Sequence, residues 1–179
     1  RDFSGEYVGN VVPIDKIGTD RHRLDSYTEE LAATQNTLYA GYPWRFSHFR
    51  KTFGYVNLPL DGIWLRAPYL HNGSVPTLRD LLNPSNERPT IFYRGYDVFD
   101  QTKVGFVSEV GKFDDYGRSK DEPDNPRRYF KFDTQVRSNG LTPRDRNEGN
   151  SNVGHEGEVY GTMLSAPEKD AIVEYLKTF

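Results

Sequence analysis

The sequence has no cysteine, no long apolar run and no block of basic residues, and each absence excludes a class of structure or partner. Without cysteine the 179 residues can form neither a disulfide nor a thiolate metal site. No apolar run approaches the roughly 18 residues that a membrane-spanning helix needs. A net charge of −3 without a basic block makes nucleic acid an improbable partner. We therefore expect no nucleic acid and no transmembrane segment.

Aliphatic residues are also scarce, whereas aromatic residues, glycine and proline are abundant. The mean hydropathy is −0.78, and the chain has 16 glycines, 11 prolines, 12 tyrosines, 11 phenylalanines and two tryptophans. Glycine and proline at this level predict long loops, and the aromatic content argues against disorder. Two interpretations remain open: a flat cofactor completes the core, or the rings form satellite clusters among themselves.

The most informative stretch runs from residue 59 to residue 82. Pro68 disfavours helix at Ala67, and His71-Asn72-Gly73 is typical of a turn in which Gly73 takes a positive φ. A short helix is predicted over residues 77–82, with Ser74 as its N-cap. His71 is then either an ordinary polar group under a helix or part of a site.

Elsewhere the pattern predicts a few local elements. A helix should run from a cap at Asp25 or Ser26 to about Asn36. Residues 91–93 and 104–110 should pair as an antiparallel hairpin. A capping box of Ser165 and Glu168 should begin a terminal helix. Between residues 41 and 54, rings alternate with basic residues, which suits either an aromatic lid or a contact with an anionic cofactor.

Three stretches resemble the bacterial di-haem c-type cytochromes, a superfamily that includes the cytochrome c peroxidases and the rubber oxygenases. They are Ala67–Ser74 with Thr77-Leu78, the segment 17–20 with Arg23, and the segment 149–155. The resemblance implies a C-terminal haem domain, mainly α and cytochrome c-like, with long loops and a small antiparallel β element. It implies one domain over residues 1–179, a fragment or processed chain without its haem-attachment helix, because no Cys-x-x-Cys-His motif is present.

The same resemblance suggests site residues. Trp64, Arg66, Tyr69, His71 and Asn72 should surround the edge of haem c, which is attached through residues outside this sequence. Arg66 should face a propionate, and His71 should support the site without binding iron. No methionine follows His71 at the spacing found in the peroxidases. His155 is therefore predicted as the metal ligand, as in the rubber oxygenases, with Met163 and then His71 as alternatives. Catalytic residues stay unknown.

The expected function is a haem-binding redox domain that transfers electrons to or within an oxidoreductase of this type. The alternatives are an electron-carrier or assembly subunit without catalysis, and a haemless binding module on the same scaffold. Expected partners are a haem-bearing segment, upstream or on another chain, and a redox partner protein. The expected location is periplasmic or extracellular. Calcium is a weaker expectation, bound through the carbonyls of Ala67 and Pro68; the acidic residues between 114 and 124 fit no EF-hand.

Overall fold

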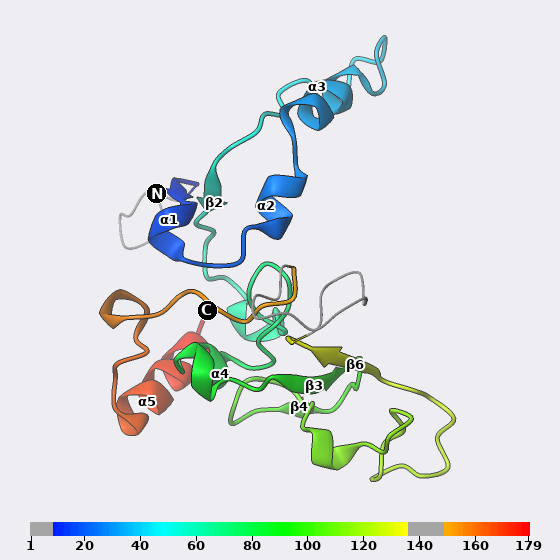
Figure 1. Ribbon diagram of the computed structural model, residues 1–179, viewed down its shortest axis with the longest axis vertical. Helices are drawn as coiled ribbons and strands as arrows, with labels where there is room; N and C mark the ends of the chain where they lie inside the picture. Colours follow the sequence, from blue (N-terminus) through cyan, green and yellow to red (C-terminus); the bar gives the residue numbers. More distant parts are fainter. Residues whose placement is uncertain (1–8, 136–148) are drawn as a thin grey trace. The chain divides into compact units, whose positions relative to one another are not determined.

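Short helices and small sheets, joined by long loops, make up the protein (Figure 1). The computed structural model describes residues 9–135 and 149–179 and divides into two compact units. Unit 1 holds residues 9–17 and 21–59, and unit 2 holds Gly18–Asp20 and the described residues from Leu60 onward. Helix accounts for 28% of the structure and strand for 15%. The predicted mainly α class is therefore wrong, because glycine and proline interrupt most stretches that could extend a helix.

Unit 1 is built on a two-stranded antiparallel sheet. Strand β1 (Val11–Pro13) pairs with β2 (Gly54–Val56), so that Pro13 lies opposite Gly54. The helices α1 (Ile14–Ile17), α2 (His22–Ser26) and α3 (Glu29–Thr37) lie between these strands in sequence. A small set of buried apolar residues holds the unit together: Ile14, Ile17, Leu24 and Ala32.

The helix predicted from Asp25 or Ser26 to Asn36 begins later, as α3, and Asp25 and Ser26 instead end α2. The break falls at Tyr27, which has an extended ψ of 98°, and Thr28 caps the second helix. The Thr28 side chain accepts a hydrogen bond from the backbone N–H of Leu31 at 3.1 Å. A threonine one turn further on thus supplies the cap that was assigned to Asp25 or Ser26.

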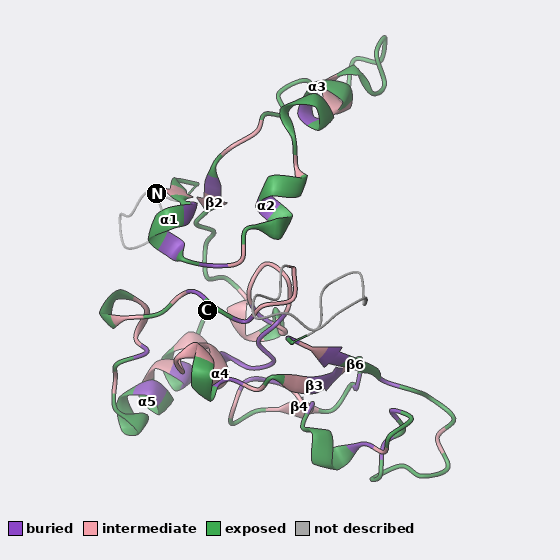
Figure 2. Cartoon of the chain, in the orientation of Figure 1, coloured by how far each residue is buried: buried purple, intermediate pink, exposed green. Residues whose placement is uncertain are grey.

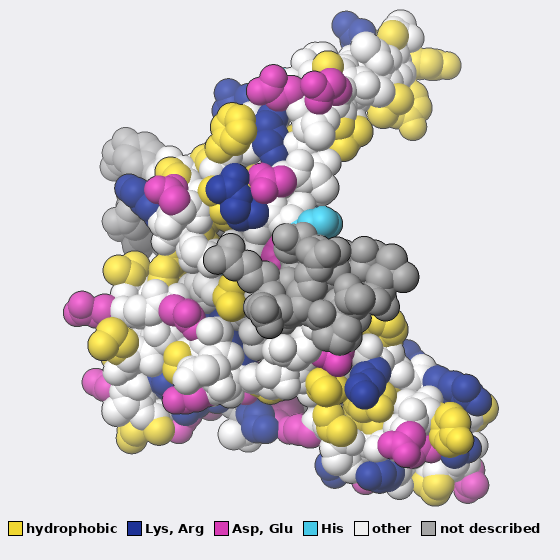
Figure 3. Space-filling model, viewed as in Figure 1, with side chains coloured by type: hydrophobic (Ala, Val, Ile, Leu, Met, Phe, Trp, Pro, Cys, Tyr) yellow, Lys and Arg dark blue, Asp and Glu magenta, His cyan; other side chains and the backbone are white. Residues whose placement is uncertain are grey.

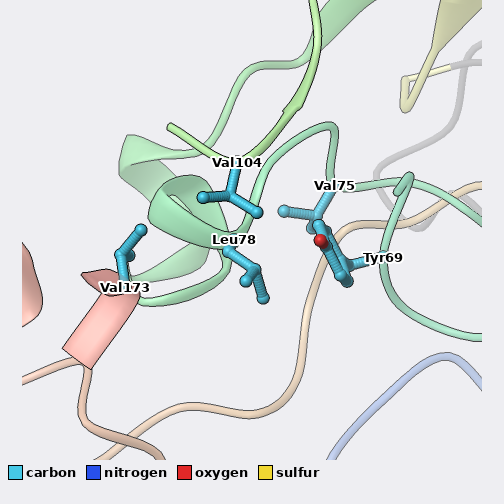
Figure 4. Packing of buried hydrophobic residues seen from close by; sticks show 5 residues of the cluster. All are labelled: Tyr69, Val75, Leu78, Val104 and Val173. Atoms are coloured by element: carbon cyan, nitrogen blue, oxygen red, sulfur yellow. The ribbon is translucent and has the colours of Figure 1, made fainter. Parts of the chain in front are cut away.

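Unit 2 has its core where the central stretch meets the terminal helix. Helix α4 (Leu78–Leu81) packs against α5 (Ala166–Leu176). Five buried side chains lie together at this place in Figure 4: Tyr69, Val75, Leu78, Val104 and Val173. The short helix predicted over residues 77–82 is confirmed in type, but its N-cap is Thr77, whose side chain accepts from the backbone N–H of Asp80 at 3.0 Å. Ser74 does not cap it.

The sheets of unit 2 pair differently from the predicted hairpin. Strand β3 (Ile91–Arg94) pairs with the distant β6 (Phe130–Asp133), and β4 (Phe99–Asp100) pairs with β5 (Gly105–Phe106). Asp100 explains the second pair, because its carboxylate accepts from the backbone N–H groups of Thr102 at 2.8 Å and Lys103 at 3.0 Å. This local turn brings Gly105 opposite Asp100, so that β5 pairs with β4. Strand β3 pairs with β6 instead.

Helix α5 begins as predicted. The carboxylate of Glu168 accepts from the backbone N–H of Ser165 at 2.8 Å, which completes the capping box. Figure 2 shows buried residues along α5, β3 and β6, which contribute to the interior of unit 2. In the described part of the chain, no helix has the length and apolarity needed to cross a membrane.

Candidate functional site

Residues 69–75 form a tight loop that carries His71 and Asn72. Two backbone hydrogen bonds close it: the N–H of Tyr69 donates to the carbonyl of Val75 at 2.6 Å, and the N–H of Val75 donates back at 3.3 Å. Gly73 has a φ of +66°, so the predicted turn is confirmed. The loop therefore holds two of the predicted site residues at a defined bend.

The loop binds the segment 149–151 through side-chain bonds to its backbone. The amide of Asn72 donates to the carbonyls of Gly149 at 3.1 Å and Ser151 at 2.8 Å. The hydroxyl of Ser74 also donates to the Ser151 carbonyl, at 3.0 Å. Because Ser74 is fully buried, its side chain is shielded from water at this contact. Asn72, predicted to contact the cofactor, has its amide committed to this segment.

Residues of the third stretch complete the arrangement. The backbone N–H of Gly149 donates to the carboxylate of Asp20 at 2.9 Å, and the hydroxyl of Thr19 donates to the Val153 carbonyl at 3.3 Å. Both residues belong to unit 2, although the chain on either side of them belongs to unit 1. Thr19 and Asp20 of the first stretch therefore contact the segment 149–153, which the loop with Asn72 also binds.

His155 and His71 lie near each other at this meeting point. The Nδ1 atom of His155 is buried and has no hydrogen-bond partner among the described residues. Burial chiefly, with electrostatic interactions with Arg88 and His71 that act in the same direction, lowers the pKa of His155. A lowered pKa leaves the imidazole neutral at neutral pH, which is the form that binds a metal. His155 therefore has the protonation state of a ligand and a ring nitrogen that the surrounding chain does not use.

Trp64, Arg66 and Tyr69 occupy other positions. Trp64 lines a cavity of about 290 Å³ together with Phe99, Gln101, Val104 and Lys177. Its indole N–H donates to the carbonyl of Phe179 at 3.0 Å. The hydroxyl of Tyr69 is directed into the core, where it donates to the Ile63 carbonyl at 3.0 Å. Arg66 is exposed and donates to the Asp61 carbonyl at 2.6 Å. The structure thus brings His71, Asn72 and His155 together. Trp64, Arg66 and Tyr69 each lie in different surroundings.

The other metal expectations find less support. Met163, the alternative ligand, is 78% exposed. Within the described residues, no group of three or more His, Cys, Asp or Glu side chains is arranged to hold an ion. The expectation of calcium thus gains no support.

Arg88 is the residue of this site that sequence reasoning did not identify. It precedes Pro89 in a turn cluster, and nothing local marks it as different from a surface arginine. In the structure it is 3% exposed, and its guanidinium donates to carbonyls of the segment 152–155. The one usable signal was its position between two stretches of the family resemblance.

Comparison with known proteins agrees with the resemblance of the central stretch. Residues 54–93 match the model of a family described as RoxA-like, cytochrome c-like. Two uncharacterized proteins of Sinorhizobium fredii (strain NBRC 101917 / NGR234) are similar to the chain. Protein y4iJ is 35% identical over 160 residues, which cover 86% of this chain and 22% of that protein. Protein y4iM is 59% identical over 54 residues, which cover 30% of this chain and 12% of that protein.

The chain therefore spans less than a quarter of either relative. The family match covers the loop with His71 and Asn72, helix α4, Arg88 and most of strand β3. The segment 54–93 is accordingly a RoxA-like, cytochrome c-like sequence, which confirms the family that the central motif predicted.

Proposed function

We propose that this chain is a haem-binding redox domain of a larger c-type cytochrome of the peroxidase and rubber oxygenase type, with His155 as an axial ligand of the iron. The observation that carries the proposal is the buried Nδ1 of His155, which has no hydrogen-bond partner among the described residues. A buried polar nitrogen without a partner is costly, and a bound ion is one explanation for such a group. The family match of residues 54–93 supports haem as the group that carries the metal.

The residues of the site fit this role in different ways. His155, kept neutral by its surroundings, would bind the iron. The loop bonds of Asn72 and Ser74 would hold the segment that carries His155 and exclude water from its backbone. When bound, haem supplies an iron that accepts and releases single electrons. Attachment of the haem would come from cysteines outside this sequence, upstream or on another chain.

The surroundings of the domain follow from the same proposal. A c-type haem is attached outside the cytoplasm, so the protein would be periplasmic or extracellular. It would exchange electrons with a redox partner protein or with a second haem of the same molecule. Trp64, Arg66 and Tyr69 stay proposed as contacts to the cofactor edge, although each is engaged elsewhere in the described structure.

The test is the absorption spectrum and reduction potential of His155→Ala in the haem-loaded protein that carries this chain. We expect a low-spin parent, a high-spin component in His155→Ala and a shifted potential, because an axial ligand is lost. Met163→Ala is the matched control and should leave both unchanged, since Met163 is exposed. A low-spin His155→Ala protein with the parental potential would contradict the proposal, and a protein without a Soret band would indicate the haemless module.

A further inference from the structure

Arg88 is buried beside His155 and uses its whole guanidinium group on backbone carbonyls. An arginine side chain has five N–H donors in a planar fork. All five make hydrogen bonds here, and every acceptor is a carbonyl oxygen. Nε donates to Asn83 at 2.8 Å, Nη2 donates to Leu81 and His155 at 3.3 Å each, and Nη1 donates to Gly154 at 2.9 Å and to Asn152. Arg88 thus joins the end of α4 to the segment that carries His155.

The backbone at Gly154 and His155, which Arg88 binds, has an unusual conformation. His155 has a φ of +54°, a region that side-chain-bearing residues rarely adopt. Gly154 before it has a φ of +92° and approaches Thr19 so closely that an added Cβ would lie 2.5 Å from the Thr19 Cα. Such a conformation persists only when its surroundings hold it from several sides. Arg88 holds this backbone by hydrogen bonds to the carbonyls of Gly154 and His155, and Thr19 packs closely against Gly154.

The imidazole itself has few direct restraints. Its ring packs against the ring of Tyr160, with centroids 5.1 Å apart at an angle of 67°. Nδ1 makes no hydrogen bond to a described residue. The direction of the ring is therefore set mainly by the backbone from which it projects, and that backbone is held by Arg88.

We propose that Arg88 is a positioning residue for His155: by binding the carbonyls of Asn152, Gly154 and His155, it fixes the backbone from which the imidazole reaches the haem iron. This inference rests on the proposed function, because it assumes that His155 is the ligand. Beyond the proposed function, it assigns to Arg88 the role of holding His155 in a fixed position for binding the iron.

The test uses two variants of the haem-loaded protein: one changes the Arg88 side chain, and the other changes the backbone that Arg88 binds. Arg88→Lys keeps the positive charge but has three donors on a flexible stem, so it cannot hold five carbonyls. Gly154→Ala leaves Arg88 intact and forces the backbone away from Thr19. Arg94→Lys is the matched control, because Arg94 is a partly buried arginine whose guanidinium lies 4.1 Å from the ring centroid of Phe132 instead.

We expect each test variant to weaken the bond between His155 and the iron on the order of tenfold. The readout is a high-spin component in the absorption and electron paramagnetic resonance spectra. Added free imidazole should restore the low-spin state by taking the place of His155. A purely structural role of Arg88 would change the melting temperature but would not produce a spin change that imidazole reverses. Arg94→Lys should keep the parental spectrum.

The outcomes separate the two proposals. If His155→Ala leaves the spectrum unchanged, the proposed function fails and this inference fails with it. If His155→Ala changes the spectrum while folded Arg88→Lys and Gly154→Ala proteins keep the parental low-spin state, the function stands and the role of Arg88 is overturned. If Arg88→Lys does not fold, Gly154→Ala tests the backbone positioning on which the inference depends: a spin change that imidazole reverses supports it, and a parental spectrum overturns it.

Discussion

At the scale of single residues, burial of the negatively charged carboxylate of Asp80 destabilises the folded protein. Its carboxylate lies at the start of α4, where it accepts a hydrogen bond from the hydroxyl of Thr77 at 2.6 Å. Burial raises the pKa of Asp80 above its ordinary value of 3.8, and the Thr77 bond with the nearby Lys103 offsets only part of this effect. The folded protein therefore binds a proton at Asp80 more tightly than the unfolded chain does.

We expect Asp80→Asn to stabilise the protein at neutral pH. Because the folded-state pKa is raised, the free energy of unfolding falls as pH rises from about 3.8 through that pKa. Asparagine stays neutral and keeps an oxygen that accepts from Thr77, so the variant should lose this part of the pH dependence. Urea unfolding of both proteins between about pH 3.5 and about pH 7 measures the difference. A variant that is less stable than the parent at neutral pH would contradict the expectation.

Single residues also show where sequence reasoning succeeded. Gly73 in the left-handed region and the Ser165–Glu168 capping box were predicted, because each depends on residues within three positions along the chain. Arg88 was not predicted, because its acceptors at residues 152–155 are more than 60 positions away. A residue type and its neighbours identify a cap, but they do not identify a buried arginine that binds distant carbonyls.

At the scale of elements, β5 depends on a close approach to the start of α4. A Cβ on Gly105 would lie 2.5 Å from the carbonyl oxygen of Pro76 and 2.9 Å from the Thr77 Cγ2. The neighbouring backbone is linked directly, since the N–H of Leu78 donates to the carbonyl of Val104 at 2.9 Å. The hairpin and the helix therefore have no room for a side chain between them.

Gly105→Ala should destabilise unit 2 by about 1–3 kcal/mol, the usual range for an atom forced into packed structure. Gly111→Ala is the matched control, because no atom lies within 4 Å of its added Cβ. That control should change stability by less than about 1 kcal/mol, since it mainly restricts the unfolded chain. Thermal unfolding followed by circular dichroism compares them. Equal melting temperatures for the two variants would show that the helix and hairpin separate easily.

The same scale explains the wrong hairpin. The sequence supplied strand-like residues at 91–93 and 104–110, and both ranges do contain strand. The pairing depended on Asp100, whose turn joins β4 to β5 within a few residues, and on β6 nearly forty residues further along. Strand propensity finds such segments, but it does not choose between a near partner and a distant one.

At the scale of the whole molecule, the two units bury their aromatic residues to different extents. In unit 2, rings pack on one another: Tyr93 stacks on Phe113 with centroids 4.6 Å apart, and Tyr96 and Tyr129 complete the cluster. In unit 1, the residues after α3 leave their rings exposed, among them Trp44 at 58% and Phe46 at 65%. Hydrophobic side chains gather on the surface in the region of α3 (Figure 3). Packing of rings on one another accounts for this buried aromatic cluster of unit 2. For unit 1, the cofactor interpretation stays a prediction.

This difference predicts that unit 1 unfolds more readily than unit 2. Unit 1 buries four apolar residues among its described positions, whereas unit 2 has two separate clusters of buried hydrophobic side chains. Buried apolar area is the main source of folding free energy, at roughly 25 cal/mol per Å². Regions with little of it open at lower free energy than the rest of a protein.

The two tryptophans allow a direct measurement, because Trp44 lies in unit 1 and Trp64 in unit 2. In Trp64→Phe, the emission of Trp44 follows unit 1 alone. In Trp44→Phe, the emission of Trp64 follows unit 2, where its indole N–H bonds to the Phe179 carbonyl. We expect the Trp44 transition at a lower urea concentration than the Trp64 transition. The Trp64→Phe substitution lies in unit 2, so it does not by itself lower the urea concentration at which Trp44 reports unfolding of unit 1. Coincident curves would show that the chain unfolds as one cooperative unit, and the separate stabilities inferred here would be wrong.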